Sequence, residues 1–264
     1  SARSRRVVRV GSGPSFGDVL VTQILIVGAT SAMARGCAFA WAAQGQRVLL
    51  AGRDDAELAR LAQDIRVRFN TAAQVVALDL DETTPREAWL ADLQETYGQI
   101  DGLLCAAGWM PDNETMRHGM PALQVIQRNF TGPVALINAF ADVCEQRKHG
   151  FIVGISSVAG DRGRQSNYLY GAAKGGFAIY LAGLRNRLFA SGVKVLTVKP
   201  GFVDTRRTFG LPGLFLVADP FWVGQQFVAA SDKGRDELYV PSFWRLILLI
   251  IRHVPEVVFK RLKL

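Results

Sequence analysis

The stretch NYLYGAAKGG at residues 167–176 places a tyrosine and a lysine four positions apart, at Tyr170 and Lys174. On a helix, residues with this separation lie on the same face, so the phenol and the ammonium group would be neighbours. An ordinary tyrosine has a pKa of about 10, and a nearby cation lowers it by favouring the phenolate. Such a pair could transfer a proton near neutral pH, although a buried aromatic beside a solvated lysine is the common alternative.

A serine and an asparagine lie at set distances from this pair. Ser157 precedes Tyr170 by 13 residues, at the end of the apolar stretch GFIVGISS, and Asn129 precedes Lys174 by 45 residues. Each falls at the carboxyl end of an expected strand or on the helix after it, which is the rim where open α/β sheets bind ligands. Tyr168 is expected to pack or to line a pocket, because Lys174 is spaced for Tyr170.

From Gln23 onward, short apolar runs alternate with segments of helical character. Strands separated by helices of this length form βαβ units, and right-handed crossovers then give a parallel sheet. The chain is therefore predicted to be an α/β protein, with a doubly wound parallel sheet in a Rossmann-type three-layer sandwich. Strands are expected at 24–29, 47–53, 74–80, 100–108, 150–157, 193–201 and 236–241, and helices at 31–46, 55–69, 85–97, 112–146, 167–190 and 219–231.

We expect one domain with two basic ends. Residues 21–241 are assigned to the Rossmann-type domain, residues 1–20 to a flexible basic arm, and residues 242–264 to a basic and apolar C-terminal helix. The chain of 264 residues is 49% hydrophobic, enough for a sizeable core. Its net charge of +8 comes equally from residues 1–9 and 242–264, which leaves the body neutral. This distribution argues against a nucleic-acid groove and favours an anionic surface or a solvated tail.

The cysteines point to a reducing compartment, and a cytoplasmic location is expected. Cys37, Cys105 and Cys144 are odd in number and have no metal-ligand spacing, and the chain has three histidines, so no metal site is expected. No run reaches the ~18–20 apolar residues of a membrane span. Any membrane contact is therefore expected to be peripheral, at the inner face of the cell membrane.

The first strand ends at Gly28, and GATSAMA then leads into a helix. Such a strand–turn–helix presents backbone N–H groups and a positive helix end to a phosphate. At the end of the second strand, Arg53 stands where NAD sites usually carry an acidic residue, and its fork suits the 2′-phosphate of NADP. NADP(H) is therefore predicted over NAD, with a solvated loop arginine beside Asp54 and Asp55 as the alternative.

Taken together, these residues resemble the short-chain dehydrogenase/reductase family over about residues 22–241. The most specific part is Ser157, Tyr170 and Lys174 at the family's spacing, with Asn129 and the segment that runs from Pro200-Gly201 to Thr205. The resemblance implies that Tyr170 exchanges a proton with a ketone or alcohol oxygen while Ser157 donates a hydrogen bond to it. Lys174 would also hold the nicotinamide ribose, and Asn129 would support a water relay to the lysine.

The same resemblance implies a set of cofactor-binding residues at the strand ends. Asp79 would contact the adenine amino group, Ala106 to Gly108 would line the adenine ribose, and Val203 and Thr205 would hold the carboxamide and phosphate end. The sequence departs from the family pattern in two places. In the turn, Ala32 and Ala34 replace family glycines, and after Cys105 the AAG lacks the family's asparagine. The full set is Gly28, Thr30, Ser31, Met33, Arg53, Asp79, Leu80, Ala106, Ala107, Gly108, Tyr170, Lys174, Pro200, Gly201, Val203 and Thr205.

The C-terminal segment and one loop bear on the substrate. Residues 240–264 mix apolar side chains with arginine and lysine, as interfacial helices do, and residues 210–222 are unusually apolar where the family has a mobile substrate loop. Both features favour a membrane-surface enzyme with a long-chain substrate. The alternative is an interface between subunits, and a homo-oligomer is expected. The apolar residues of the tail are Phe243, Trp244, Leu246, Leu249, Ile250 and Phe259.

Several substrates and one other function stay open. The tail and turn are similar, more weakly, to bacterial reductases of keto-pentoses carried on decaprenyl phosphate. Long-chain 3-keto lipids and small soluble ketones are competing substrates. A nucleotide sensor that binds NADP without turnover is the alternative function, although a sensor has no need of the Ser157–Tyr170–Lys174 set.

Overall fold

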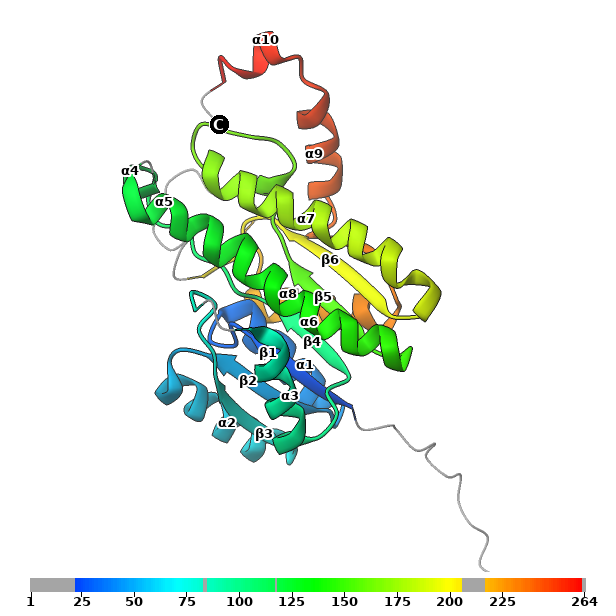
Figure 1. The fold of residues 1–264 in the computed structure, drawn as a ribbon. Helices are drawn as coiled ribbons and strands as arrows, with labels where there is room; N and C mark the ends of the chain where they lie inside the picture. Colours follow the sequence, from blue (N-terminus) through cyan, green and yellow to red (C-terminus); the bar gives the residue numbers. More distant parts are fainter. Residues whose placement is uncertain (1–21, 83–84, 117, 206–216, 263–264) are drawn as a thin grey trace, which may run out of the picture.

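The computed structural model describes residues 22–82, 85–116, 118–205 and 217–262. Within these residues, seven parallel strands form a sheet in the order β3-β2-β1-β4-β5-β6-β7 (Figure 1). The strand order reverses between β1 and β4, so the predicted doubly wound α/β fold is confirmed. The strands are β1 (Gln23–Val27), β2 (Arg47–Gly52), β3 (Ala73–Ala77), β4 (Gly102–Cys105), β5 (Phe151–Ile155), β6 (Lys194–Pro200) and β7 (Glu237–Val240).

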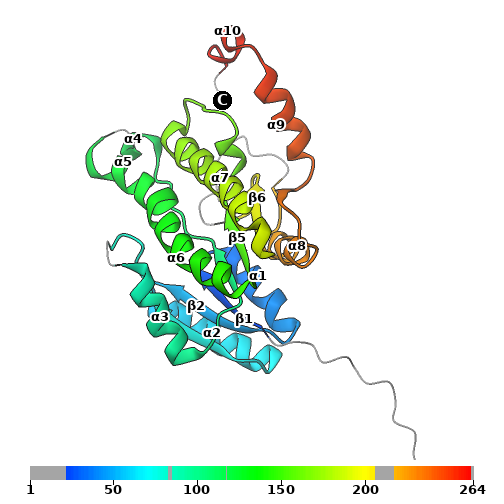
Figure 2. The same ribbon diagram turned by 45° about the vertical axis from the view of Figure 1, so that its right-hand side comes forward.

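Helices cover both faces of the sheet, as Figures 1 and 2 show. Along β1, Ile24 and Ile26 pack with one group of helices, whereas Leu25 and Val27 pack with the other, because successive side chains of a strand point to opposite faces. The first group is α1 (Ala32–Ala43), α2 (Asp55–Phe69) and α8 (Pro220–Asp232), and the second is α3 (Arg86–Tyr97), α6 (Gly132–Arg147) and α7 (Tyr168–Leu188).

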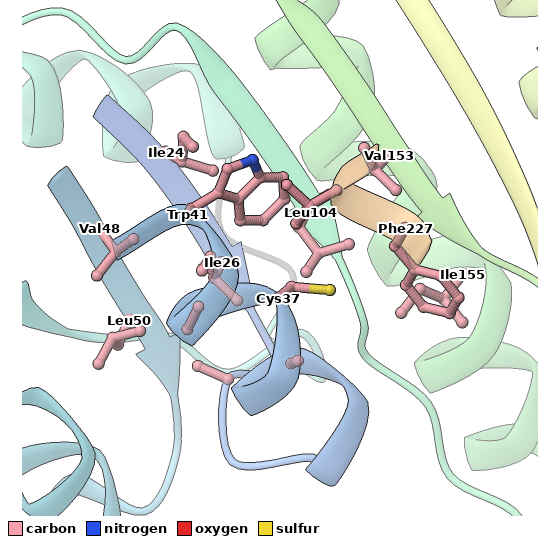
Figure 3. Packing of buried hydrophobic residues seen from close by; sticks show 14 of the residues in the cluster. Ile24, Ile26, Cys37, Trp41, Val48, Leu50, Leu104, Val153, Ile155 and Phe227 are labelled. Carbon is pink, nitrogen blue, oxygen red and sulfur yellow. The ribbon is translucent and has the colours of Figure 1, made fainter. Parts of the chain in front are cut away.

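The core between α1, α8 and the sheet holds the turn between β1 and α1 in place. Trp41 and Cys37 of α1 and Phe227 of α8 meet the strand residues Ile26 and Val153 in this core (Figure 3). All five side chains are buried. Packing of this kind stabilises α1 in one orientation, and the N-terminus of α1 consequently points toward the carboxyl edge of the sheet.

The remaining helices differ in detail from the sequence-based expectation. The helical region after β4 is divided into α4 (Asn113–Met116), α5 (Gly119–Ile126), a π-helical turn (Gln127–Thr131) and α6. The single helix expected over 242–264 is wrong in detail, since the structure has α9 (Trp244–His253) and α10 (Glu256–Phe259). Val254 adopts an extended conformation between them because Pro255 follows, and a proline disfavours helix at the preceding residue.

Three of the expected features fall wholly or partly outside the described residues. The basic arm 1–20 does so entirely, and so do residues 210–216 of the apolar loop and residues 263–264 of the tail. Among the helices that the structure does describe, none combines the length and apolarity needed to cross a bilayer.

Candidate active site

Ser157, Tyr170 and Lys174 line one pocket of about 690 Å³ at the carboxyl edge of the sheet. Tyr170 and Lys174 lie on the first two turns of α7, and the Lys174 Nζ atom is 6.0 Å from the centroid of the Tyr170 ring. Ser157 follows β5 directly. The fold thus brings together the three side chains that the sequence singled out. Of the expected cofactor residues, this pocket also contains Thr30, Ser31, Met33, Ala106, Ala107, Gly108, Pro200, Gly201, Val203 and Thr205.

Lys174 is a buried cation held by strand-end carbonyls. Its Nζ atom donates hydrogen bonds to the carbonyl oxygens of Ile155, at 2.9 Å, and Ala107, at 3.4 Å. The Ser156 hydroxyl in turn donates to the Lys174 carbonyl oxygen at 2.7 Å. A buried charge is stable only where hydrogen bonds replace its lost hydration. These contacts fix the lysine between β4 and β5, at the floor of the pocket.

Ser157 is held by the short 3₁₀ turn that it begins. Its Oγ atom accepts a hydrogen bond from the Ala159 backbone N–H at 3.1 Å, which caps the turn Val158–Gly160. A hydroxyl has one donor and two acceptor positions. Because the backbone contact uses an acceptor position, the hydroxyl proton of Ser157 can be donated to a ligand oxygen.

A buried polar network supports this turn from behind. Lys199 of β6 lies 2.9 Å from an oxygen of Asp161 and 2.7 Å from an oxygen of Glu237, and the Tyr239 hydroxyl donates to Asp161 at 2.7 Å. Burial lowers the pKa of Lys199, but its hydrogen bonds to Glu237 and Asp161 outweigh burial and leave the pKa raised. This network was not predicted from the sequence, although a charged residue within the apolar run VKVLTVKPG was a signal for it.

Asn129 lies behind both pockets and lines neither of them. It is fully buried in the π-helical turn, and its amide donates to the carbonyls of Trp109 and Val125 and accepts from the Trp109 N–H at 3.2 Å. A Cβ atom at Gly108 would lie 2.9 Å from Asn129 Oδ1 and 3.3 Å from Lys174 Nζ. Gly108 therefore lies between Asn129 and Lys174. The water-relay role of Asn129 stays a prediction.

A second pocket of about 660 Å³ adjoins the first along the sheet edge. Both pockets are lined by Thr30 and Ser31 of the first turn and by residues 106–108 after β4, so together they form one long groove. Such a groove suits an extended ligand at the point where the strand order reverses. The other expected cofactor residues in the second pocket are Gly28, Arg53, Asp79 and Leu80.

The turn after β1 brings the chain close to the segment after β4. Gly28 has φ +73°, and a Cβ atom there would lie 2.9 Å from the Ala107 backbone nitrogen, so the position requires glycine. Ser31 caps α1 by accepting from the Ala34 N–H at 3.3 Å. The two alanines that replace family glycines differ in their surroundings, because Ala32 lines the groove whereas Ala34 is buried in the core.

Arginines and carboxylates alternate at the far end of the groove. Arg53 lies 3.6 Å from Asp81 and 4.0 Å from Asp79, and its side chain is largely exposed. Arg128 donates to both oxygens of Asp81, at 3.0 and 2.7 Å, and its guanidinium carbon is 4.7 Å from the Trp109 ring centroid. The sequence analysis missed three of these groove residues, namely Trp109, Arg128 and Asp81. Adjacency to Gly108 and Asn129 was the available signal for the first two.

The fold and groove define a doubly wound α/β protein of the dinucleotide-binding type. Over residues 22–210, the chain matches the family described as short chain dehydrogenase. The chain therefore belongs to the short-chain dehydrogenase family, whose members are oxidoreductases. An uncharacterized oxidoreductase of Mycobacterium tuberculosis is 28% identical over 221 residues, which cover 83% of this chain and 89% of that protein.

Solved structures show the same architecture. A short-chain dehydrogenase from Sphingobium yanoikuyae, in complex with NADPH, has a TM-score of 0.77 and 23% identity, covering 89% of this chain and 97% of its own. An actinorhodin polyketide ketoreductase with NADPH has a TM-score of 0.74 and 22% identity, covering 85% and 97%. At these identities, the two structures establish the fold.

Proposed function

We propose that this chain is an NADP(H)-dependent oxidoreductase that transfers hydride between the nicotinamide and a ketone or secondary alcohol. The observation that carries the proposal is the convergence of Ser157, Tyr170 and Lys174 on one pocket that continues into a groove floored by Gly28 and Gly108. A nucleotide sensor would need only the groove and would have no use for these three side chains.

The residues of the groove fit a dinucleotide. Gly28 and Gly108 keep its floor free of side chains, and the N-terminus of α1 offers backbone donors next to Thr30 and Ser31. When bound, the nicotinamide would supply or accept the hydride. Lys174, held at the floor by Ile155 and Ala107, fixes a positive charge at the junction of the two pockets.

In the direction of ketone reduction, Tyr170 would give its hydroxyl proton to the ketone oxygen. Ser157 would donate a hydrogen bond to the same oxygen, where negative charge develops. The Lys174 cation near the Tyr170 ring favours the phenolate that is left, and the reverse reaction returns the proton to Tyr170. Asn129 would act through Gly108 and Trp109 by keeping the segment after β4 in place.

We propose NADP(H) rather than NAD because Arg53 faces the groove at the end of β2. Its ion pairs with Asp79 and Asp81 are long and exposed, so the guanidinium can exchange them for a phosphate. The NADPH bound by the two similar solved structures supports this choice.

For the substrate, we propose a ketone on a long apolar chain or a lipid carrier, reduced at the cytoplasmic face of the membrane. The support is the exposed apolar surface of α9 and α10, together with the contact of Trp244 on α9 with Gly201 of the pocket. Small soluble ketones stay the alternative substrate. Assembly into a homo-oligomer also stays a prediction, and light scattering of the purified chain measures it.

The test is titration of the purified chain with NADPH and NADH, followed by nicotinamide fluorescence, and then hydride transfer to a panel of ketones. Tyr170→Phe should bind NADPH like the wild type and lose turnover. Tyr168→Phe should retain turnover, because Tyr168 is 49% exposed and lines neither pocket. Binding without turnover in the wild type, across soluble and long-chain ketones, would favour the sensor. Absence of NADPH binding would refute both functions.

A further inference from the structure

The C-terminal helices carry an apolar surface that none of the other described residues covers. On α9, Trp244 and Leu248 turn inward and pack with Val158 and Tyr239. The side chains of Leu246, Leu249 and Ile250 are on the outward side and are 63%, 53% and 61% exposed. A helix that is apolar on two sides needs a partner for the outer one, because exposed aliphatic patches are unfavourable in water.

The short helix α10 extends this surface. Val257 and Val258 are 61% and 50% exposed, whereas Phe259 between α10 and the body is buried. In Figures 1 and 2, α9 and α10 project from one end of the molecule. We name the outward residues Leu246, Leu249, Ile250, Val257 and Val258 the outer face.

The outer face is bordered by positive charge. Arg245 and Arg252 are exposed on α9, and Lys260 and Arg261 are exposed directly after α10. Glu256 is the one acidic residue between 242 and 262, and it is engaged by Arg162 at 3.0 Å. An aliphatic stripe bordered by cations is the pattern of helices that lie in the interface of an anionic bilayer.

Arg162 fastens this surface to the catalytic part of the chain. It donates to the carbonyl oxygens of Ile251 and Val254, the latter at 2.6 Å, and its guanidinium carbon lies 3.7 Å from the Phe259 ring centroid. These contacts satisfy carbonyls at the end of α9, where cations are favourable. Arg162 itself lies between Ser157 and Tyr170 in the chain, so the outer face is ordered relative to the pocket.

The inner side of α9 also touches the pocket wall. Trp244 stacks edge-on against Phe202 at 5.3 Å, and a Cβ atom at Gly201 would collide with its indole ring. Gly201 lines the catalytic pocket. Through Trp244, α9 consequently contacts the wall of the proposed active site.

We propose that the outer face is a docking surface for an anionic membrane, with α9 lying in the plane of the interface. With ten residues, α9 is about 15 Å long, which is half of a bilayer's hydrocarbon core. A second copy of the chain fits the surface poorly, because a two-fold contact would bring the arginines of α9 against each other, and the one acid between 242 and 262, Glu256, already pairs with Arg162. Delivery of the substrate by the bilayer rests on the proposed function. Docking of the outer face on the membrane does not.

Flotation of the full chain with vesicles tests the proposal. We expect binding to phosphatidylcholine vesicles that contain phosphatidylglycerol and at least tenfold weaker binding to phosphatidylcholine alone. Leu246→Gln/Leu249→Gln/Ile250→Gln and Arg245→Glu/Arg252→Glu should each weaken binding to the anionic vesicles by about tenfold or more. The basic arm is intact in every variant, so its contribution cancels.

Matched controls use exposed residues elsewhere. Ile179→Gln/Phe189→Gln removes exposed apolar side chains from the region of α7. Lys233→Glu/Arg235→Glu reverses two exposed cations before β7. Both control variants should bind vesicles like the wild type. Equal binding by the α9 variants, or absence of wild-type binding, would overturn the proposal. So would a change from dimer to monomer in the apolar variant with vesicle binding unchanged, which would assign the face to a second copy.

NADPH binding and turnover of a soluble ketone, both without vesicles, separate this proposal from the proposed function. The α9 variants should keep both. A wild-type chain that turns over the ketone but does not bind vesicles would refute docking alone. A wild-type chain that binds vesicles but not NADPH would refute the oxidoreductase function alone.

Discussion

The ammonium group of Lys199 lies 2.9 Å from a carboxylate oxygen of Asp161, behind the turn that Ser157 caps and outside both pockets. Asp161 ends that turn, and Lys199 belongs to β6 next to Pro200, which lines the pocket. The pair therefore joins two walls of the proposed active site without touching a ligand itself.

Replacing Lys199 by methionine should destabilise the protein, because the Asp161 carboxylate stays buried without its cation. We expect the free energy of unfolding to fall by about 3 kcal/mol, measured by urea denaturation. Glu237→Gln removes the partner whose side chain is 43% exposed and should cost less than ~1 kcal/mol. Equal losses in the two variants would contradict a buried, structural ion pair.

Lys174→Met should affect both rate and stability. We expect hydride transfer to fall by about 10²–10⁴-fold, as for loss of a general acid–base partner. Because the carbonyls of Ile155 and Ala107 lose their donor, the free energy of unfolding should also fall by about 2 kcal/mol. Tyr170→Phe should show the rate effect with little change in stability. Single-turnover kinetics and thermal unfolding measure the two effects, and a Lys174→Met enzyme with most of its rate would refute the assignment.

Arg53→Ala should weaken binding of NADPH about tenfold more than that of NADH, since a charge-assisted contact to a phosphate is worth about 1.5 kcal/mol or more. Dissociation constants for both cofactors, measured by fluorescence, give the comparison. Arg68→Ala is the control, because Arg68 pairs with Asp64 on the same helix and lines neither pocket. An equal effect of Arg53→Ala on NADPH and NADH would remove the 2′-phosphate role.

Gly108→Ala should impair turnover more than folding. The added methyl group would lie 2.9 Å from Asn129 Oδ1, and hydrogen bonds to Trp109 and Val125 prevent that amide from yielding. The flexible end of Lys174 would move instead, and we expect about a tenfold loss in kcat, since small misplacements of catalytic groups are costly. Gly183→Ala, on α7 with open space around it, should leave kcat unchanged and raise stability slightly. Identical kcat values for the two variants would disprove the role of Gly108.

Stability should fall as the pH rises above about 9, where thiols of the unfolded chain begin to ionise. Burial raises the pKa of Cys105 and of Cys144 from 9.0 to about 11. Between pH 9 and 11, the folded state therefore binds more protons than the unfolded state, and the free energy of unfolding decreases. The raised pKa of Lys199 acts in the same direction, since its contribution is complete below about pH 10.5 and is lost above it.

Urea denaturation at several pH values measures this slope. Cys105→Ala removes one of the contributing groups and should make the decline between pH 9 and 11 shallower, by up to about 2 kcal/mol over the interval. A stability that stays level or increases over this range would contradict the protonated, buried state of the thiols.

Local pattern was sufficient for the fold class and for choosing Ser157, Tyr170 and Lys174, which the fold brings to one pocket. The apolar runs and helical segments are properties of neighbouring residues, and the spacing of Tyr170 and Lys174 on one helix places them on one face wherever that helix goes. Ser157 could be added because carboxyl ends of parallel strands meet at one edge of a sheet. These predictions needed no knowledge of how distant segments pack.

The supporting contacts, by contrast, were decided by tertiary structure. Arg128 and Asp81 are 47 residues apart, and Arg162 reaches across about 90 residues to the end of α9. No periodicity encodes which distant carboxylate or carbonyl a long arginine meets, since that depends on how β3, β4 and the C-terminal helices are stacked. The sequence determined the sheet and the residues that meet at its carboxyl edge, whereas the packing of remote segments decided the ion pairs that hold them and the face that α9 leaves exposed.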